Sequence, residues 1–427
     1  MPANRSARTS FSDRFASLAA GEGEHEYLLR CARKHDDIVR VAQRAYLISR
    51  PEWINDIFMR TGKECQKFDN LIRNEANMQN QQAWMALRNS AAGGSGAVNV
   101  APFIPRLVQL MNLRVDAWTS GSTFDAITEM RELTAQAIAS YCFGDDVQGI
   151  PQACSALSRL FNSPGEANFV ARWLAWPKYW QTVAAKARLT EEVEAAIERR
   201  QGAASDCERN DFLTVLLQPQ HREPLPRSEL ARTLITMLLA AHQSPAATLA
   251  WIWFVLAVRP EVRSRLESEW SEVLTGRDVA ADDLPKLIYT RAVINETLRV
   301  YPPAWLQSRR VVQPFQIEGV QFRRGDTLLL SPYVVGRDPR YFHEPDVFKP
   351  ERWLDEAWTR SLPKGAFFPF GGGPRGCPGR HLGMTELLVT TATIGRRVRL
   401  EIDPGSRTTA RPNRTLIPEG LRLVVHK

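Results

Sequence analysis

One cysteine lies in a glycine-rich loop near the C-terminal end of the chain, where the surrounding residues suit a reactive thiolate. The loop runs from Phe370 to Gly383 and reads F-G-G-G-P-R-G-C-P-G-R-H-L-G. Its glycines can take backbone angles closed to other residues, so they let a bulky planar ligand approach. Proline favours the first position of a helix, so the sequence predicts Cys377 as the N-cap of a helix over residues 378–395. A helix N-terminus favours thiolate over thiol, and a thiolate suits a large, soft, iron-containing ligand.

Other kinds of site fit this loop less well. A phosphate-binding loop has Gly-Lys-Ser/Thr after its glycines, and those residues are absent here. A zinc site needs a second cysteine or a histidine pair close by, and Cys377 has no cysteine neighbour in the sequence. An ordinary surface loop does not require a cysteine, an arginine and several glycines at one fixed spacing.

The loop resembles the haem-binding signature of the cytochromes P-450, F-x-x-G-x-R-x-C-x-G. Every fixed position is matched, by Phe370, Gly373, Arg375, Cys377 and Gly379. The resemblance implies that Cys377 is the axial thiolate ligand of the iron of haem b, iron protoporphyrin IX. It implies that Arg375 holds a haem propionate and that Phe370 packs beside the sulfur, with Gly379 completing the cofactor-binding loop.

Further residues match the positions at which this family holds the haem propionates. Trp84 and Arg88 lie four apart in a predicted short helix over residues 81–89, so they share a face. The family uses W-x-x-x-R at this place to give two donors to a propionate, although a tryptophan packed on an arginine stem is a common alternative. Arg309 lies where the family has a second clamp, and its neighbour Arg310 leaves the choice between the two open.

A long predicted helix, over residues 227–258, matches the helix that carries the catalytic residues of the family. Its centre reads A-A-H-Q-S-P, where the family has Ala-Gly-x-acid-Thr. The resemblance places Ala241 at the glycine, Gln243 at the acid and Ser244 at the threonine, which makes these three the catalytic candidates. Ser244 keeps a hydroxyl group, but a carboxamide cannot carry a proton as a carboxylate can.

Two neighbours of these residues raise further expectations. His242 is interpreted as a core histidine rather than a proton relay, because adjacent helical positions point to different faces. Pro245 has no amide hydrogen to donate to the carbonyl of Ala241, so the helix is predicted to open at Ala240–Ala241. The freed carbonyl would hold water or a polar substrate group. Protons would then come through water and Ser244, or from an N–H or O–H of the substrate itself.

Another short pattern predicts a structural ion pair. Glu296 and Arg299 are spaced as E-x-x-R in a predicted helix over 286–300, so the side chains are neighbours. Such pairs are common and worth little on a surface. The resemblance implies a buried triad completed by Arg352 of F-K-P-E-R-W, which locks the loop that presents Cys377.

The elements that position these residues predict a mainly α fold with a small β-rich region, as in the cytochrome P-450 fold. A hairpin is predicted over 37–49, with further strands over 304–331 and after 397. Helices are predicted over 26–34, 51–60, 101–118, 123–142, 151–162, 168–200, 227–258, 260–275 and 286–300. Residues 1–427 are expected to form a single domain, with a frayed segment over 1–24.

The amino-acid composition indicates what broad class of protein this is. With 44% hydrophobic and 24% charged residues the chain is typical of a soluble globular protein. The first residues contain no apolar run, which predicts a cytoplasmic protein without a membrane anchor. The six cysteines show no paired spacing, which fits a reducing compartment. Although the formal charge is +8, arginines are spread along the chain without the basic runs of a nucleic-acid reader.

The resemblance implies a soluble, bacterial-type haem-thiolate monooxygenase, expected as a monomer, that oxidises a small organic substrate such as a natural-product intermediate. Electrons are expected from a separate acidic ferredoxin or flavodoxin, for which Arg380, Arg396 and Arg397 are candidate basic contacts. Two alternatives stay open. One is an oxidative coupling enzyme that forms a C–C or C–N bond without inserting oxygen, and the other is a haem protein that senses a ligand without turnover.

Overall fold

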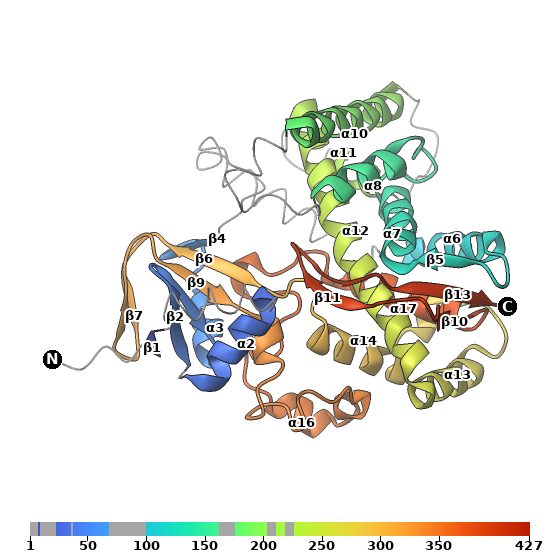
Figure 1. The fold of residues 1–427 in the computed structure, drawn as a ribbon. Coiled ribbons are helices and arrows are strands. Elements are labelled where there is room, and N and C mark those ends of the chain that lie inside the picture. The colour runs from blue at the N-terminus through green and yellow to red at the C-terminus, as the bar shows by residue number, and fades with distance from the viewer. Residues whose placement is uncertain are drawn as a thin grey trace. The chain divides into compact units, whose positions relative to one another are not determined.

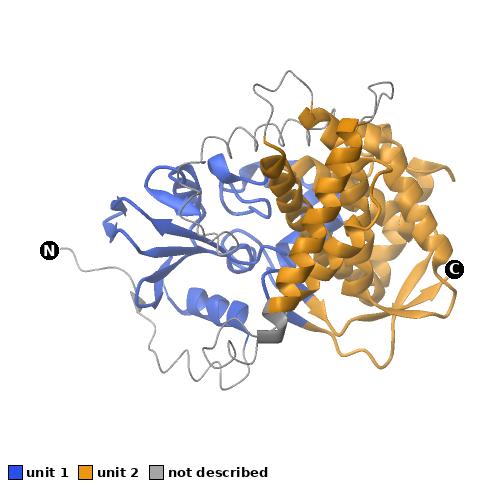
Figure 2. Cartoon of the chain, turned by 90° about the horizontal axis from the view of Figure 1, so that it is seen from above, with its two compact units in different colours: residues 1–79, 291–377, 410–417 blue, residues 80–290, 378–409, 418–427 orange. Residues whose placement is uncertain are grey.

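The computed structural model describes residues 7–8, 23–35, 37–67, 100–161, 176–202, 211–217 and 226–427. Trp84 and Arg88 lie outside the described residues. The chain forms two compact units, coloured separately in Figure 2. The first contains residues 1–79, 291–377 and 410–417, and the second contains residues 80–290, 378–409 and 418–427. In the described ranges, no helix is long and apolar enough to cross a membrane.

A six-stranded sheet is the centre of the first unit. Its strands, in spatial order, are β1 (Ala7–Arg8), β2 (Ile38–Ala42), β3 (Ala45–Ile48), β9 (Thr327–Leu330), β6 (Gln307–Val311) and β4 (Cys65–Lys67). The hairpin predicted over 37–49 is thus confirmed as β2 and β3. Strand β3 pairs in parallel with β9, with Ala45 opposite Thr327, so the two ends of this unit meet in one sheet.

Short elements surround this sheet. They are α2 (Glu24–Lys34), α3 (Pro51–Met59), β7 (Phe315–Ile317), β8 (Val320–Phe322), α15 (Pro332–Val335), η4 (Pro350–Leu354), α16 (Glu356–Ser361) and η5 (Gly373–Arg375). Helix α14 (Ile288–Val300) lies almost entirely in this unit, and β11 (Thr409–Pro412) pairs with β12 (Leu416–Glu419). One apolar core joins α3 to the sheet through Ile54, Ile57 and Phe58, none of which is exposed by more than 1%.

Helices make up most of the second unit (Figure 1). They are η2 (Ala101–Phe103), α6 (Ile104–Ala117), α7 (Ala126–Phe143), α8 (Ile150–Phe161), α10 (Trp176–Gly202), α11 (Phe212–Leu217), α12 (Arg227–Val258), α13 (Pro260–Leu274), η3 (Ala281–Asp283) and α17 (Arg380–Gly395). A three-stranded sheet completes the unit, in the order β10 (Arg399–Ile402), β13 (Arg422–His426) and β5 (Thr123–Asp125).

Helix α12 is the long central helix of this unit and packs against α7, α10 and α17. Its predicted bounds, 227–258, agree with the structure to the residue. Proline precedes its first residue, and Pro260 begins the next helix, so both ends carry residues that break or start helices. The prediction of a mainly α fold with a small β-rich part is confirmed.

Candidate functional site

Cys377 is exposed and lies in the first unit, in the segment between η5 and α17. Its backbone N–H donates to the carbonyl of Phe370 at 2.8 Å, which closes the loop. The prediction that Cys377 is a helix N-cap is wrong. Helix α17 begins at Arg380 with Gly379 as its N-cap, because Pro378 and Gly379 form a turn and the first helical bond joins Gly383 N–H to the Gly379 carbonyl at 2.8 Å.

Two glycines of the loop are required by its contact with α3. Gly373 has a φ of +62°, and a Cβ atom built there would lie 2.3 Å from the carbonyl oxygen of Phe58. A Cβ atom at Gly372 would lie 2.7 Å from the Phe58 ring. Any side chain at either position would push the loop off α3. The sequence analysis explained these glycines by the close approach of a ligand. In the structure, the group that lies against them is Phe58.

Arg309 faces the interior of the first unit, whereas Arg310 faces solvent. Because side chains alternate along β6, the side chain of Arg309 is only 1% exposed and that of its neighbour is exposed. Arg309 Nε donates to Thr61 Oγ1 at 3.0 Å, and Nη1 donates to the Ser308 carbonyl at 2.9 Å. Thr61 was not foreseen, since nothing in its local sequence marks a residue that is 248 positions away.

The charges around Arg309 fit the propionates of a haem. Burial lowers the pKa of Arg309 to about 10, and the nearby charge of Arg375 adds to this effect, while Cys65 acts in the opposite direction. Among the described residues, no carboxylate bonds to Arg309. A buried cation needs an anionic or hydrogen-bonding partner. The two propionates would supply it, and the Cys377 sulfur is the donor type that haem iron accepts.

The predicted triad of Glu296, Arg299 and Arg352 is confirmed. Glu296 and Arg299 are fully buried with 2.7 Å between Oε1 and Nη2, and Arg352 Nε lies 3.2 Å from Glu296 Oε1. The Glu296 carboxylate also accepts two hydrogen bonds that the sequence did not predict. The donors are Trp353 Nε1 and the Lys349 backbone N–H, each at 2.8 Å.

Arg299 also fastens the chain after α15. Its guanidinium donates to the carbonyls of Gly336 and Pro345 at 2.6 Å and of Val347 at 3.0 Å. The link from this network to the Cys377 loop is made by aromatic rings. The Trp353 ring lies 4.4 Å from that of Phe367, and Phe368 contacts Phe58. The triad therefore supports the loop indirectly, through packing.

In the second unit, α12 presents a partly open face at its centre. Ala240 is exposed there, and Ala241, Gln243 and Ser244 are partly exposed. Thr233, Thr236 and Thr248 on this helix donate their hydroxyls to carbonyls four residues earlier, at 2.8, 2.8 and 2.9 Å. The Ser244 hydroxyl makes no such bond to any residue in the described part of the chain, so its proton is available to a bound molecule.

Helix α12 continues without a break through Pro245, so the prediction that it opens at Ala240–Ala241 is wrong. Proline removes only one hydrogen bond, the one to the Ala241 carbonyl. Packing of the buried residues around Pro245, together with hydrogen bonds from neighbouring helices to His242, holds the helix together at this point.

The interpretation of His242 as a core histidine is confirmed. Its side chain is fully buried, and burial lowers its pKa to about 4, with the Leu238 carbonyl acting in the opposite direction and Arg131 adding to the lowering. Its ring nitrogens contact Ser158 Oγ at 2.6 Å and the Leu238 carbonyl at 2.8 Å. A neutral imidazole with a hydrogen-bond partner at each ring nitrogen supports the packing of three helices at this position.

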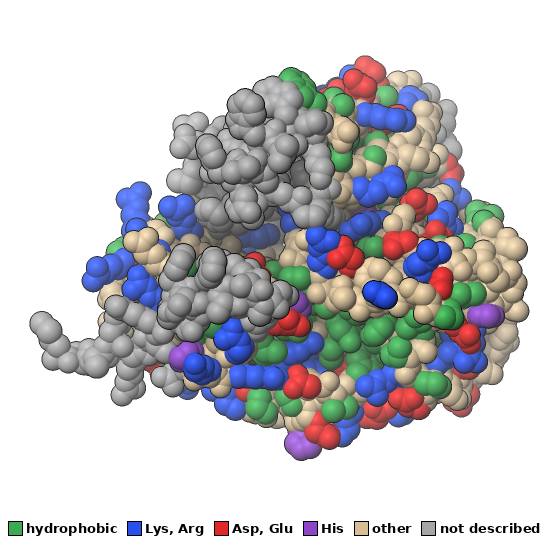
Figure 3. Space-filling model, viewed as in Figure 1, with side chains coloured by type: hydrophobic (Ala, Val, Ile, Leu, Met, Phe, Trp, Pro, Cys, Tyr) green, Lys and Arg blue, Asp and Glu red, His purple; other side chains and the backbone are tan. Residues whose placement is uncertain are grey.

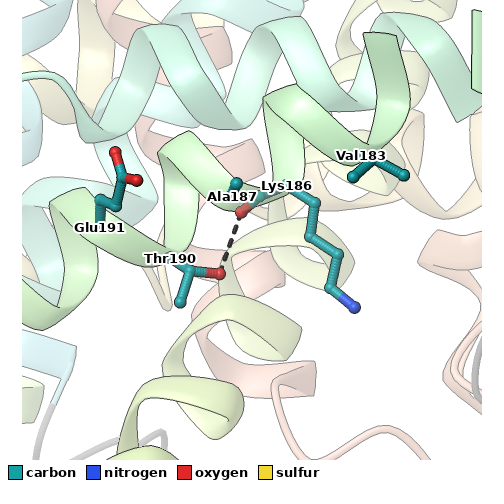
Figure 4. Close-up of a pocket in the computed structure, with 5 residues that line it drawn as sticks. All are labelled: Val183, Lys186, Ala187, Thr190 and Glu191. Carbon is teal, nitrogen blue, oxygen red and sulfur yellow. Dashed lines mark hydrogen bonds between the residues drawn. The ribbon is translucent and has the colours of Figure 1, made fainter. Parts of the chain in front are cut away.

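A surface hollow of about 470 Å³ runs along α10 (Figure 4). It is lined by Val183, Lys186, Ala187, Thr190 and Glu191. The Thr190 hydroxyl donates to the Lys186 carbonyl at 2.9 Å, so it is used by its own helix. A second hollow, of about 200 Å³, lies between α2 and strands β2, β3 and β9. Neither hollow contains a predicted site residue.

Two of the three arginines suggested as basic contacts for an electron donor are balanced by acids. Arg397 lies 2.6 Å from Asp116, and Arg396 lies 3.7 Å from Asp278. Arg380, at the start of α17, is exposed. On the face drawn in Figure 3, basic and acidic side chains are interspersed without a large area of one sign.

Comparison with known proteins identifies the family. A family model described as Cytochrome P450 matches residues 15–424. The chain belongs to the cytochrome P450 family. Cytochromes P450 are haem-dependent oxidoreductases, so the chain is an enzyme of that class.

Two curated relatives of this P450 come from Streptomyces melanosporofaciens. Cyclooctatin synthase is 33% identical over 319 residues, which are 72% of this chain and 69% of the relative. Cyclooctat-9-en-7-ol 5-monooxygenase is 29% identical over 389 residues, which are 87% of this chain and 84% of the relative.

Solved structures of other P450s share the fold at low identity. The haem domain of cytochrome P450DA superposes with a TM-score of 0.82 at 18% identity, covering 99% of this chain and 97% of that one. The P450 named CYP102L1 gives a TM-score of 0.79 at 22% identity, covering 94% and 97%.

Proposed function

We propose that this P450 is a monooxygenase that inserts one oxygen atom into an uncharged, largely apolar natural-product intermediate. Helix α12 carries this proposal: from Thr233 to Val258 it contains no Asp, Glu, Lys or Arg, and its partly open centre presents small side chains and one available hydroxyl. A charged substrate would lose its hydration there without gaining an ion pair from this helix. Cyclooctat-9-en-7-ol, the unsaturated alcohol in the name of one relative, is a compound of the proposed kind.

The cofactor would be held by residues of the chain in the following roles. Cys377 would give the axial thiolate, and Phe370 and Gly379 would shape the loop around it. Arg309 and Arg375 would bind the propionates, together with Trp84 and Arg88. Haem b with a thiolate ligand supplies the activation of dioxygen that this chemistry needs.

The residues of α12 would donate protons and orient the bound water and substrate by hydrogen bonding. Ser244 would donate its hydroxyl proton to a bound water or substrate, since that proton is not used by the backbone. Gln243 would orient a water by hydrogen bonding but would not release a proton. The Ala241 carbonyl, which lacks a backbone donor because of Pro245, would accept a hydrogen bond from a substrate O–H or N–H.

Gln243 supports a second candidate, oxidative coupling without oxygen insertion. With no carboxylate at this position, protons for breaking the O–O bond would come from the substrate's own O–H or N–H groups. Electrons in either case would come from a separate acidic ferredoxin or flavodoxin, and Arg380 is the arginine proposed to contact it.

Two measurements test this proposal. The reduced carbon-monoxide complex of the purified protein should show the red-shifted band of a thiolate ligand, and Cys377→His should lose that band while retaining some haem. Turnover of uncharged, unsaturated alcohols under heavy-isotope dioxygen should place the label in the product. Survival of the band in Cys377→His would refute the ligand assignment. An unlabelled, dehydrogenated or coupled product would favour the second candidate.

A further inference from the structure

Three helices of the second unit meet at His242, on the face of α12 opposite its partly open side. We define the His242 junction as His242, Leu238, Ser158, Thr134 and Cys154. Nε2 of the ring lies 2.6 Å from Ser158 Oγ of α8, and Nδ1 lies 2.8 Å from the Leu238 carbonyl of α12. The His242 carbonyl accepts the Thr134 hydroxyl of α7 at 3.0 Å. One residue thus connects α12 to both α7 and α8.

The hydrogen-bond partners fix the proton arrangement of this ring. A carbonyl oxygen is only an acceptor, so Nδ1 carries the hydrogen and donates it to Leu238. Nε2 is then the acceptor, and Ser158 donates its hydroxyl proton to it. Cys154 Sγ lies 3.5 Å from Nδ1 and completes the shell around the ring. Ring and hydroxyl are fully buried, so their hydrogen bond is shielded from water.

The junction coincides with the weakest point of α12. Pro245 removes the hydrogen bond to the Ala241 carbonyl, and proline normally kinks a helix there. Helix α12 is nevertheless continuous over Arg227–Val258. On the near side of the proline, His242 holds the helix to α7 and α8, and on the far side Thr248 donates to the Ser244 carbonyl at 2.9 Å. The defective turn is therefore fixed by side chains instead of by its own backbone bond.

Because α12 is a continuous helix, the attachment of His242 on one face also sets the position of the residues on the open face. Successive residues are rotated by about 100°, so Ala240 and Ser244 lie nearly opposite His242. The structure agrees, because His242 is fully buried whereas Ala240 is exposed and Ser244 is partly exposed. A shift or rotation of the helix at His242 would move Ser244 and the Ala241 carbonyl by a similar amount.

We infer that His242 is a positioning residue, held by Ser158 and Thr134, that fixes where the Ser244 hydroxyl and the Ala241 carbonyl stand against the bound ligand. The inference rests on the proposed function, in which these two groups face the ligand. An apolar residue of similar size would fill the same space, but it would remove the hydrogen bond to Ser158 and leave α12 free to bend at Pro245. The junction thus compensates for the proline that frees the Ala241 carbonyl.

Carbon monoxide on the reduced holoenzyme is a suitable probe, because its C–O stretching band responds to polar groups beside it and needs no known substrate. His242→Leu should broaden or split this band, and Ser158→Ala should do the same to a smaller extent. His242→Gln should retain a single narrow band, since a carboxamide both donates and accepts. Thr297→Val is the matched control: it also removes a fully buried hydroxyl, one that bonds to the Val293 carbonyl at 2.8 Å, and should leave the band unchanged.

Ser244→Ala separates this inference from the function on which it rests. If Ser244→Ala shifts the band but His242→Leu and Ser158→Ala leave its position and width as in the parent protein, the positioning role is refuted. If Ser244→Ala itself has no effect, the proposed placement of Ser244 beside the ligand fails. Should His242→Leu not fold, Ser158→Ala still decides, because it removes the hydrogen bond to the ring with little change in volume.

Discussion

Arg131 of α7 is a buried cation with an unsatisfied donor. The residue is 8% exposed, and its Nε has no hydrogen-bond partner among the described residues. Burial lowers its pKa, Asp125 acts in the opposite direction, and Arg159 adds to the lowering. Burying a charge of this kind costs free energy, and no hydrogen bond at Nε compensates for that cost.

We therefore expect Arg131→Met to stabilise the protein. Methionine keeps the length and apolar contacts of the arginine stem, and the free energy of unfolding should rise by about 1–3 kcal/mol. Denaturant unfolding of the holoenzyme measures this. Arg360→Met is the control, since Arg360 is exposed and should change stability little. A loss of stability in Arg131→Met would show that the charge has a partner, such as a bound anion.

Removal of the Glu296 carboxylate should lower the free energy of unfolding. Glu296→Ala leaves the buried Arg299 without its counter-ion and strands the donors of Arg352 and Trp353, at a cost of about 3–5 kcal/mol. Haem content and denaturant unfolding measure the loss. Glu356→Ala removes an equivalent carboxylate from an exposed pair with Arg360 and should cost less than about 1 kcal/mol. Equal stabilities of the two variants would contradict a structural role for the triad.

Among elements, α14 is capped by a residue from another helix. Glu269 of α13 accepts the backbone N–H groups of Tyr289 and Thr290, at 2.5 and 2.9 Å, and the Thr290 hydroxyl at 2.6 Å. These are N–H groups of the first turn, which have no partner within the helix, and a negative charge there is favourable. The residue directly before α14 is Leu287, which has no side-chain acceptor, so this cap could not be predicted.

We expect Glu269→Ala to lower the free energy of unfolding by about 1–3 kcal/mol, because three donors lose their acceptor. Glu272→Ala, an exposed position on the same helix, is the control and should change little. Denaturant unfolding compares the two. A Glu269→Ala protein as stable as Glu272→Ala would show that water replaces the cap.

The site divides into parts that the sequence could and could not predict. The Cys377 signature, the bounds of α12 and the Glu296–Arg299 pair depend on local spacing, which is visible in a sequence, whereas the resemblance to the family supplied Arg352. The choice between Arg309 and Arg310 depends on which face of β6 meets the core, and the Thr61 contact depends on distant pairing. The start of α17 was misjudged because Pro378 and Gly379 form a turn. The behaviour of α12 at Pro245 was misjudged because tertiary contacts outweighed a local preference.

For the whole molecule, the buried Glu386 of α17 should govern how stability depends on pH in the neutral range. Burial raises the pKa of Glu386 to about 8 from a usual value of 4.5. Its Oε1 has no hydrogen-bond partner among the described residues. The folded state therefore holds a proton that the unfolded state has lost between these values. The stabilising contribution is complete below about pH 4.5 and is lost as pH rises towards 8.

Glu386→Gln should remove this decline. The variant should resemble the parent protein near pH 5 and be more stable by a few kcal/mol at pH 8, because an amide carries no charge to desolvate. Unfolding curves across this range, with the exposed Glu356→Gln as control, measure the difference. A parent protein whose stability is flat between pH 5 and 8 would contradict a raised pKa.

The parallel pairing of β3 with β9 has a consequence for synthesis of the protein in the cell. The residues that pair, Ala45 and Thr327, are separated by 282 positions. At about 5–20 residues per second, the ribosome needs roughly 14–56 s to make the second strand after the first. During that time the hairpin of β2 and β3 emerges with an open edge and with Leu47 and Ile48, which are fully buried in the finished protein, still exposed to water. The nascent chain therefore passes through a long aggregation-prone interval, and added chaperone should raise the yield of overexpressed protein.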